Sequence, residues 1–173
     1  MVKEANSILG VINRCFLNKT KDILVPLLVR SHLEYCVQAW QPYLVKDIEL
    51  MEKVQKQMTR KLPDLKNMSY PKRLKILGLT TLESRRLRGD LIEVFNIVKG
   101  FDNNDRNIFF HKDIGVCRGH SEKLHKHTFN LDVQKFSFSQ RFINHWNAPT
   151  QHAVDCNTVN SFKRCVDKGK GYL

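Results

Sequence analysis

The stretch TLESRRLRGDLIEVFNIVKG, residues 81–100, has the apolar spacing of a long helix with one buried face. Its apolar residues recur at steps of three and four: Leu87, Leu91, Val94, Phe95 and Val98. Side chains at these steps share one side of an α-helix. Thr80 or Thr81 can cap the start, and Gly100 can end the helix because glycine adopts the left-handed conformation readily. We therefore expect a helix here whose apolar side belongs to the core.

Helical patterns also precede this stretch. Apolar residues recur with the helical period in Asn6–Leu17, in residues 23–40, in residues 47–62 (DIELMEKVQKQMTRKL) and in residues 69–79 (SYPKRLKILGL). Prolines at positions 42 and 63 follow two of these segments, and proline cannot continue a helix. The sequence predicts a helical domain over residues 1–100.

The segment HLEYCVQAWQPYL, residues 32–44, places one cysteine, one histidine and three aromatic residues close together. Such a cluster is compatible with a reactive or ligand-binding site and with the buried side of a helix. Cys36 shares a helical face with Leu33 and Trp40, and no base or second ligand stands at a matching spacing. The pattern therefore favours a structural role for Cys36.

The turn-rich sequence FDNNDRN, residues 101–107, is the predicted domain boundary, and the pattern changes after it. In HTFNLDVQKFSFSQR, residues 127–141, apolar residues alternate at Phe129, Leu131 and Val133 and again at Phe136 and Phe138, which predicts one or two strands. FSQRFINHWN and VNSFKRCVDK, residues 138–147 and 159–168, are predicted short helices, the second of which starts near Thr158. We expect a mainly α protein with a small mixed α/β segment over residues 101–173.

Positive charge is concentrated in one part of the chain. The whole chain has 29 Lys and Arg against 17 Asp and Glu, for a formal net charge of +12. Between Lys53 and Arg88 there are eleven basic residues and only two acids, Asp64 and Glu83. Such a segment fits a polyanionic partner, since each neutralised phosphate releases a counterion. It also fits a solvated face that only keeps the protein soluble.

Cysteine usage and hydropathy bear on the compartment. The five cysteines form an odd set without a CxxC pair, which is typical of a reducing environment. No apolar run reaches the roughly 20 residues of a membrane span, and the first residues lack the apolar centre of a signal peptide. We expect an intracellular protein, cytoplasmic or nuclear, without a membrane partner.

Metal and catalytic motifs are weak. Cys117, His120, His125 and His127 resemble half of a zinc site, but no second close pair completes it, and the neighbouring residues are basic. A basic, histidine-containing loop that faces solvent or RNA is the preferred interpretation. Nucleophile, phosphate-loop and paired-carboxylate motifs are absent. The sequence predicts no catalytic residues, no metal and no cofactor.

Several motifs, in order, resemble one family. The pieces are LVRSHLEYC, MEKVQKQMTR, LKILGL and LESRRLRGDLI, followed by RGHSEKL, FSQRFINHWNA and VNSFKRCVDK, and the likeness as a whole runs from about Asn6 to Asp167. They are similar to the region after the catalytic palm of LINE-type non-LTR retrotransposon reverse transcriptases. VPLLVR is about four residues shorter than the family pattern, Ser31 replaces a proline, and WNAPTQH lacks the Leu-Pro that usually follows.

The resemblance implies a helical, thumb-like bundle over residues 1–100 that grips template–primer, and a C-terminal basic segment that helps to bind element RNA. The palm and its metal-binding aspartates are not in this sequence, so the chain is expected to be non-catalytic. Its expected partners are RNA or an RNA–DNA duplex, together with the rest of a reverse transcriptase. The departures from the pattern fit a truncated or decaying copy.

The expected phosphate-binding residues lie within the basic segment or in the downstream loop. In the basic segment they are Lys53, Lys56, Arg60, Lys61, Arg85, Arg86 and Arg88. Arg118, His120 and Lys123 form a second, weaker set, and Arg86 can instead pair with Asp90 on its own helix. The two tryptophans, at 40 and 146, are expected as core anchors rather than stacking platforms. A helical protein-interaction module and a non-functional transposon fragment remain the alternatives.

Overall fold

The computed structural model describes residues 41–102, 104–113 and 119–169, together with Ser7, Gly10, Val11 and Arg14, which are helical. The rest of the helices predicted before residue 41, with Cys36 and Trp40, lies outside the described residues. The chain divides into two compact units, residues 1–86 and residues 87–173. The boundary expected at residues 100 and 101 falls within the second unit.

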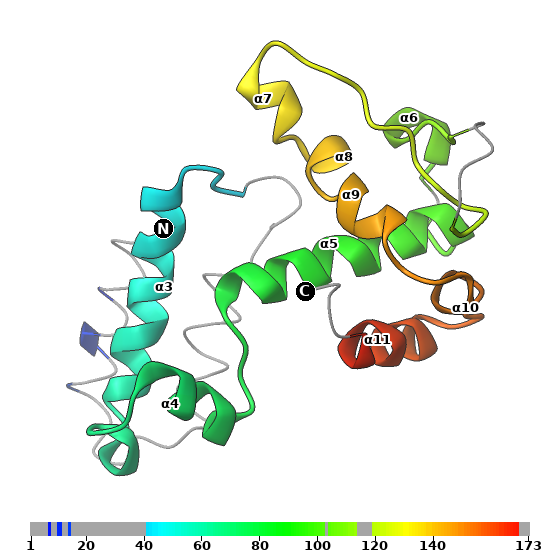
Figure 1. Cartoon of the computed structure of the whole chain (residues 1–173). Coiled ribbons are helices and arrows are strands. Elements are labelled where there is room, and N and C mark those ends of the chain that lie inside the picture. The colour runs from blue at the N-terminus through cyan, green and yellow to red at the C-terminus, as the bar shows by residue number, and fades with distance from the viewer. Residues whose placement is uncertain are drawn as a thin grey trace. The chain divides into compact units, whose positions relative to one another are not determined.

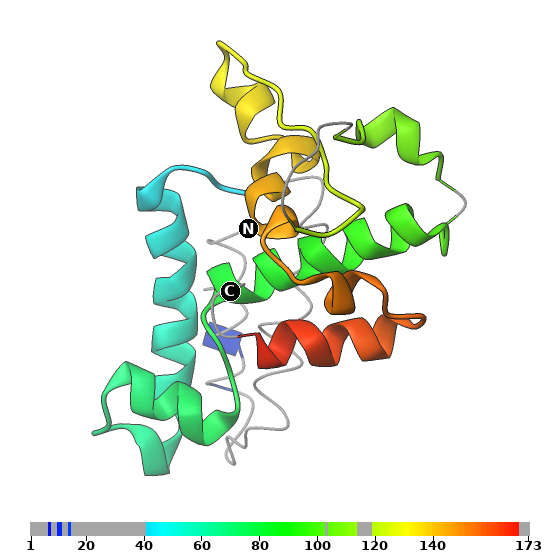
Figure 2. The same cartoon turned by 45° about the vertical axis from the view of Figure 1, so that its right-hand side comes forward.

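The first unit contains α3 (Val45–Arg60), the short 3₁₀ helix η2 (Pro63–Leu65) and α4 (Tyr70–Leu77), and it ends in the first turn of α5 (Leu82–Lys99). Figures 1 and 2 show α4 beside the C-terminal end of α3. α3 buries Met51, Val54 and Met58, which are three or four residues apart, as the helical period of the sequence predicts.

Glycine ends α4 and α5 in the same way. Gly78 and Gly100 have φ angles of 64° and 70°, in the left-handed region. After Gly78, the Leu79 N–H donates to the Leu74 carbonyl at 2.9 Å, which satisfies a carbonyl of the last helical turn. The helix stop predicted at Gly100 is therefore confirmed, and Gly78 ends α4 by the same conformation.

The second unit is a set of helices around the remainder of α5. They are α6 (Arg106–Phe109), α7 (Asp132–Lys135), α8 (Phe138–Arg141), α9 (Ile143–Asn147), α10 (Gln151–Val154) and α11 (Val159–Lys168). In Figures 1 and 2, α11 runs along one side of α5, and α8 and α9 lie on its other side. None of the helices in the described ranges is long and apolar enough to cross a membrane.

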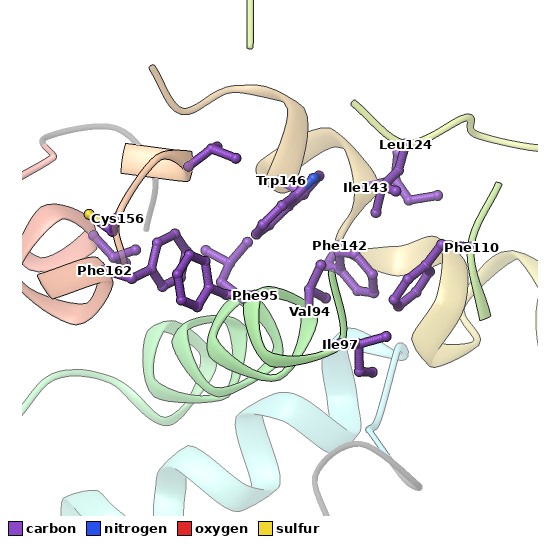
Figure 3. Close-up of a cluster of buried hydrophobic side chains, with 13 residues drawn as sticks. Val94, Phe95, Ile97, Phe110, Leu124, Phe142, Ile143, Trp146, Cys156 and Phe162 are labelled. Carbon is purple, nitrogen blue, oxygen red and sulfur yellow. The ribbon is translucent and has the colours of Figure 1, made fainter. Parts of the chain in front are cut away.

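The core of the second unit forms where α5 meets these helices (Figure 3). The rings of Phe95 and Phe162 stack with centroids 4.2 Å apart, and Phe110 meets Phe142 edge to face at 5.4 Å. Trp146 is fully buried, so the prediction that it anchors the core is confirmed. Leu91, Val94 and Phe95 of the predicted stripe are fully buried, and Leu87 and Val98 pack against the same cluster.

The mainly α prediction is confirmed, but the strands predicted within residues 127–141 are wrong. Residues 132–135 and 138–141 are helical, and the described part of the chain contains no strand, only an isolated antiparallel bridge between Lys112 and Leu124. The alternation did not mark a buried sheet face, because Leu131 and Val133 are 63% and 78% exposed. Helix α8 instead places Phe138 beside Phe142, and the centroids of the two rings lie 5.2 Å apart.

Candidate nucleic-acid interface

Four predicted phosphate-binding residues are exposed at the C-terminal half of α3. They are Lys53, Lys56, Arg60 and the C-capping residue Lys61. Since the apolar side of α3 is buried, the first three form a stripe on its opposite side, about 10 Å long at 1.5 Å of rise per residue. All four side chains are exposed, and none of them forms an ion pair with another described residue.

A polar network holds α4 and the start of α5 against α3. The Glu52 carboxylate accepts a hydrogen bond from the Tyr70 hydroxyl, and its other oxygen accepts one from the Leu82 N–H at 3.0 Å. The buried Gln55 amide donates to the Tyr70 hydroxyl and to the Thr80 carbonyl, both at 3.0 Å. The N–H of Leu82, the first residue of α5, has no acceptor within its own helix. Glu52 accepts this hydrogen bond and therefore caps α5 from 30 positions earlier in the sequence.

Tyr70 links this network to the basic residues. Burial, and next the hydrogen bond to Glu52, raise the pKa of Tyr70, so the hydroxyl stays protonated and donates. Lys56 Nζ lies 5.4 Å from the centre of the Tyr70 ring, and Arg73 Cζ lies 5.6 Å from it. Both distances fit a cation–π contact, which holds Lys56 near the start of α4.

Arg73 is a structural rather than an exposed cation. Its side chain is buried and donates to the carbonyls of Met68 at 3.1 Å and Lys56 at 3.4 Å. It therefore ties α4 to the backbone of α3. Lys66, Lys72 and Lys75, by contrast, are exposed in the same unit. These three lysines are missing from the predicted set of phosphate-binding residues. For Lys72 and Lys75 the sequence held a signal, because their spacing relative to the apolar Leu74 and Leu77 places them on the outward face of α4.

The predicted arginines of α5 are less exposed than the basic residues of α3, or they are paired with an acid. Arg86 is only 4% exposed, and its Nη1 lies 3.4 Å from the Met51 sulfur, so it adds little charge to the surface. Arg85 is half-buried. Arg88, which belongs to the second unit, donates to both oxygens of Asp167 at 2.6 and 2.9 Å. This pairing lowers the pKa of Asp167 and neutralises the Arg88 charge.

Residues 120–124 of the downstream loop dock on α9. The His120 Nε2 lies 2.8 Å from the Trp146 carbonyl oxygen, and the Trp146 indole N–H donates to the Glu122 carbonyl at 2.8 Å. Asn147 bonds both backbone groups of Leu124, at 3.0 and 2.9 Å. His120 is buried, and burial lowers its pKa. The prediction of a histidine-containing loop that faces solvent or RNA is therefore wrong for His120, whose ring belongs to the docking contact, whereas His125 is exposed.

Of the other two members of the second predicted set, the structure describes one. Lys123 is half-buried, and Arg118 lies outside the described residues. The rings of His125 and His127 meet edge to face with centroids 4.8 Å apart. No group of three or more His, Cys, Asp or Glu within the described ranges can hold a metal ion.

Several residues of the sequence motifs make contacts within the second unit. Asp90 of RRLRGDLI accepts two hydrogen bonds from Arg141 of FSQR, both at 2.8 Å. Arg141 is therefore a partner of Asp90. It competes with the alternative partner predicted from the sequence, Arg86 on the same helix as Asp90. Phe162 of VNSFK stacks on Phe95, as described above. These motif residues support the fold rather than an exposed site.

The chain has no significant match among protein-family models, curated proteins or solved structures.

Proposed function

We propose that this chain is a non-catalytic nucleic-acid-binding protein that holds RNA or an RNA–DNA duplex through phosphate contacts. One observation carries the proposal: Lys53, Lys56 and Arg60 form an exposed stripe without ion-pair partners among the described residues. Lys61, Lys66, Lys72 and Lys75 add exposed positive charge in the same unit. Phosphate contacts of this kind give affinity without sequence choice.

The resemblance to LINE-type reverse transcriptases supplies the class of ligand. In that family the corresponding region is a thumb that grips template–primer, and we propose the same role for the unit built on α3 and α4. We propose binding as the activity, because the motifs that carry the resemblance correspond to the thumb and the segment after it. Arg85, Arg86 and Arg88 stay predictions, with Arg86 acting through its contact with Met51 of α3.

The number of exposed cations sets the expected salt dependence. Four phosphate contacts, from Lys53, Lys56, Arg60 and Lys61, give a slope of about −3.6 in log K against log salt on a duplex. Between 50 and 200 mM salt the affinity should therefore fall roughly 150-fold. Contacts from the lysines of α4 would make the slope steeper by about 0.9 for each residue.

Fluorescence anisotropy with a labelled RNA–DNA hybrid tests the proposal. We expect micromolar binding at low salt, and a loss of at least tenfold when Lys53, Lys56 and Arg60 are replaced by Glu. The matched control replaces the exposed residues Lys126, Lys135 and Arg164 by Glu, which changes the net charge equally outside the proposed stripe. Equal losses in both variants would show that net charge alone attracts the nucleic acid, and would refute the proposed stripe.

A protein-interaction module is the second candidate, because apolar side chains are exposed around the start of α3. Val45 is 69% exposed, and Tyr43, Leu44 and Leu50 are exposed as well. Exposed apolar groups of this kind are common at protein interfaces. A chain that is folded by circular dichroism but does not bind the hybrid at low salt would favour this function over the first.

A further inference from the structure

Two cysteines of the second unit lie side by side. Cys156 stands in the connection between α10 and α11, Cys165 lies within α11, and their sulfurs are 3.6 Å apart. Both are free thiols; Cys156 is 9% exposed and Cys165 is half-buried. Nine positions separate them in sequence, so neither a CxxC motif nor a helical repeat pairs them. The α10–α11 connection alone creates this contact.

A small cavity opens beside Cys165. It has a volume of about 290 Å³, and its lining includes Cys165, His152 and the two basic residues Arg164 and Lys168. Cys156 does not line it. A reagent that enters the cavity therefore meets Cys165 first, and positive charge beside the thiol favours an anionic reagent.

We propose that Cys156 and Cys165 form a reversible disulfide, and that an anionic low-molecular-weight disulfide of the oxidised-glutathione class brings this about through the cavity at Cys165. In the first step the Cys165 thiolate attacks one sulfur of the small disulfide, which forms a mixed disulfide and releases one small thiol. In the second step the Cys156 thiolate attacks the Cys165 sulfur and releases the second small thiol. Two protein thiols are oxidised, one small disulfide is reduced, and two protons pass to the released thiols.

The geometry needs only a short movement to complete the bond. A disulfide is about 2.05 Å long, so the sulfurs must approach by roughly 1.5 Å. Cys156 lies outside the regular helices, where the backbone can adjust more easily than inside α11. Burial, followed by the neighbouring Cys156 thiol, raises the pKa of Cys165, so the thiolate is scarce at neutral pH and the reaction is best followed at about pH 8.

Peptide mapping tests the pairing, because trypsin cleaves between the two cysteines at Lys163 and Arg164. The full chain is incubated with oxidised glutathione, alkylated, and digested without reduction. We expect peptide 142–163 joined to peptide 165–168 as the main disulfide product of the native protein. In urea the same treatment should give a mixture that also includes Cys15, Cys36 and Cys117. An equal mixture with and without urea would overturn the proposal.

Variants separate the roles of the two thiols. Cys156→Ser should stop the reaction at a glutathionyl group on Cys165, and Cys117→Ser should leave the linked peptide unchanged. Arg164→Gln with Lys168→Gln should slow the native reaction with oxidised glutathione several-fold, but not the reaction with the cationic disulfide cystamine. A Cys156→Ser chain that acquires no glutathionyl group at Cys165 would contradict the proposed first step.

Discussion

The buried ion pair between Asp90 and Arg141 should contribute far more to stability than the exposed pair between Arg88 and Asp167. Both pairs are bidentate and lie in the second unit, but the side chains of Asp90 and Arg141 are 1% and 10% exposed, whereas that of Asp167 is 51% exposed. Removal of one partner of a buried pair leaves an uncompensated charge and costs about 3–5 kcal/mol. Loss of an exposed pair costs about 0.2–1 kcal/mol.

Asp90→Asn and Asp167→Asn are therefore the matched substitutions, since each keeps the shape of the side chain and removes one negative charge. For the first we expect a fall of about 3–5 kcal/mol in the free energy of unfolding, which moves the urea midpoint by about 2 M for a typical m value. For the second we expect a shift within about 1 kcal/mol. A chain with Asp90→Asn that is already unfolded without urea fits the same expectation.

Urea unfolding followed by tryptophan fluorescence measures both variants, with Trp40→Phe as the background so that the signal comes from the buried Trp146. The double variant Asp90→Leu with Arg141→Met should be more stable than Asp90→Asn, because it does not leave the Arg141 guanidinium buried without its carboxylate. If Asp90→Asn costs no more than Asp167→Asn, the argument that burial gives this pair its importance is refuted.

Three further changes test other parts of the second unit. Burial, and next the nearby Asp102, raise the pKa of Glu93, so its ionised form is disfavoured in the fold. Glu93→Gln should therefore raise the melting temperature at pH 7. The gain should vanish as pH falls below about 4.3, because the carboxyl is then protonated in the folded and the unfolded chain. Phe162→Ala removes the ring stacked on Phe95 and should cost about 3–5 kcal/mol in thermal melts followed by near-ultraviolet circular dichroism. Thr158→Ala removes the capping box of α11 and should cost about 1 kcal/mol by guanidinium unfolding, whereas Thr158→Ser should cost less.

The exposed part of the candidate site was predictable from spacing. Lys53, Lys56 and Arg60 alternate with buried apolar residues at the helical period, so their outward direction follows once α3 forms. The environments of Arg86 and Arg88 were not predictable in the same way. Arg86 lies against the sulfur of a residue 35 positions earlier, and Arg88 pairs with an acid 79 positions later. Sequence spacing carries no information about contacts at such separations.

Where a helix end depends on a glycine or a capping residue at that end, the sequence by itself determined the end of the helix. Gly78 and Gly100 end α4 and α5 because only glycine takes the left-handed conformation without strain, and Thr158 caps α11 through a neighbour three residues away. Tertiary structure decided the rest. It packed Phe138 of α8 against the core although the apolar residues there alternate, it buried His120 against the Trp146 carbonyl, and it brought the thiols of Cys156 and Cys165 together. Each of these outcomes depends on packing between segments, and no local pattern of residues encodes it.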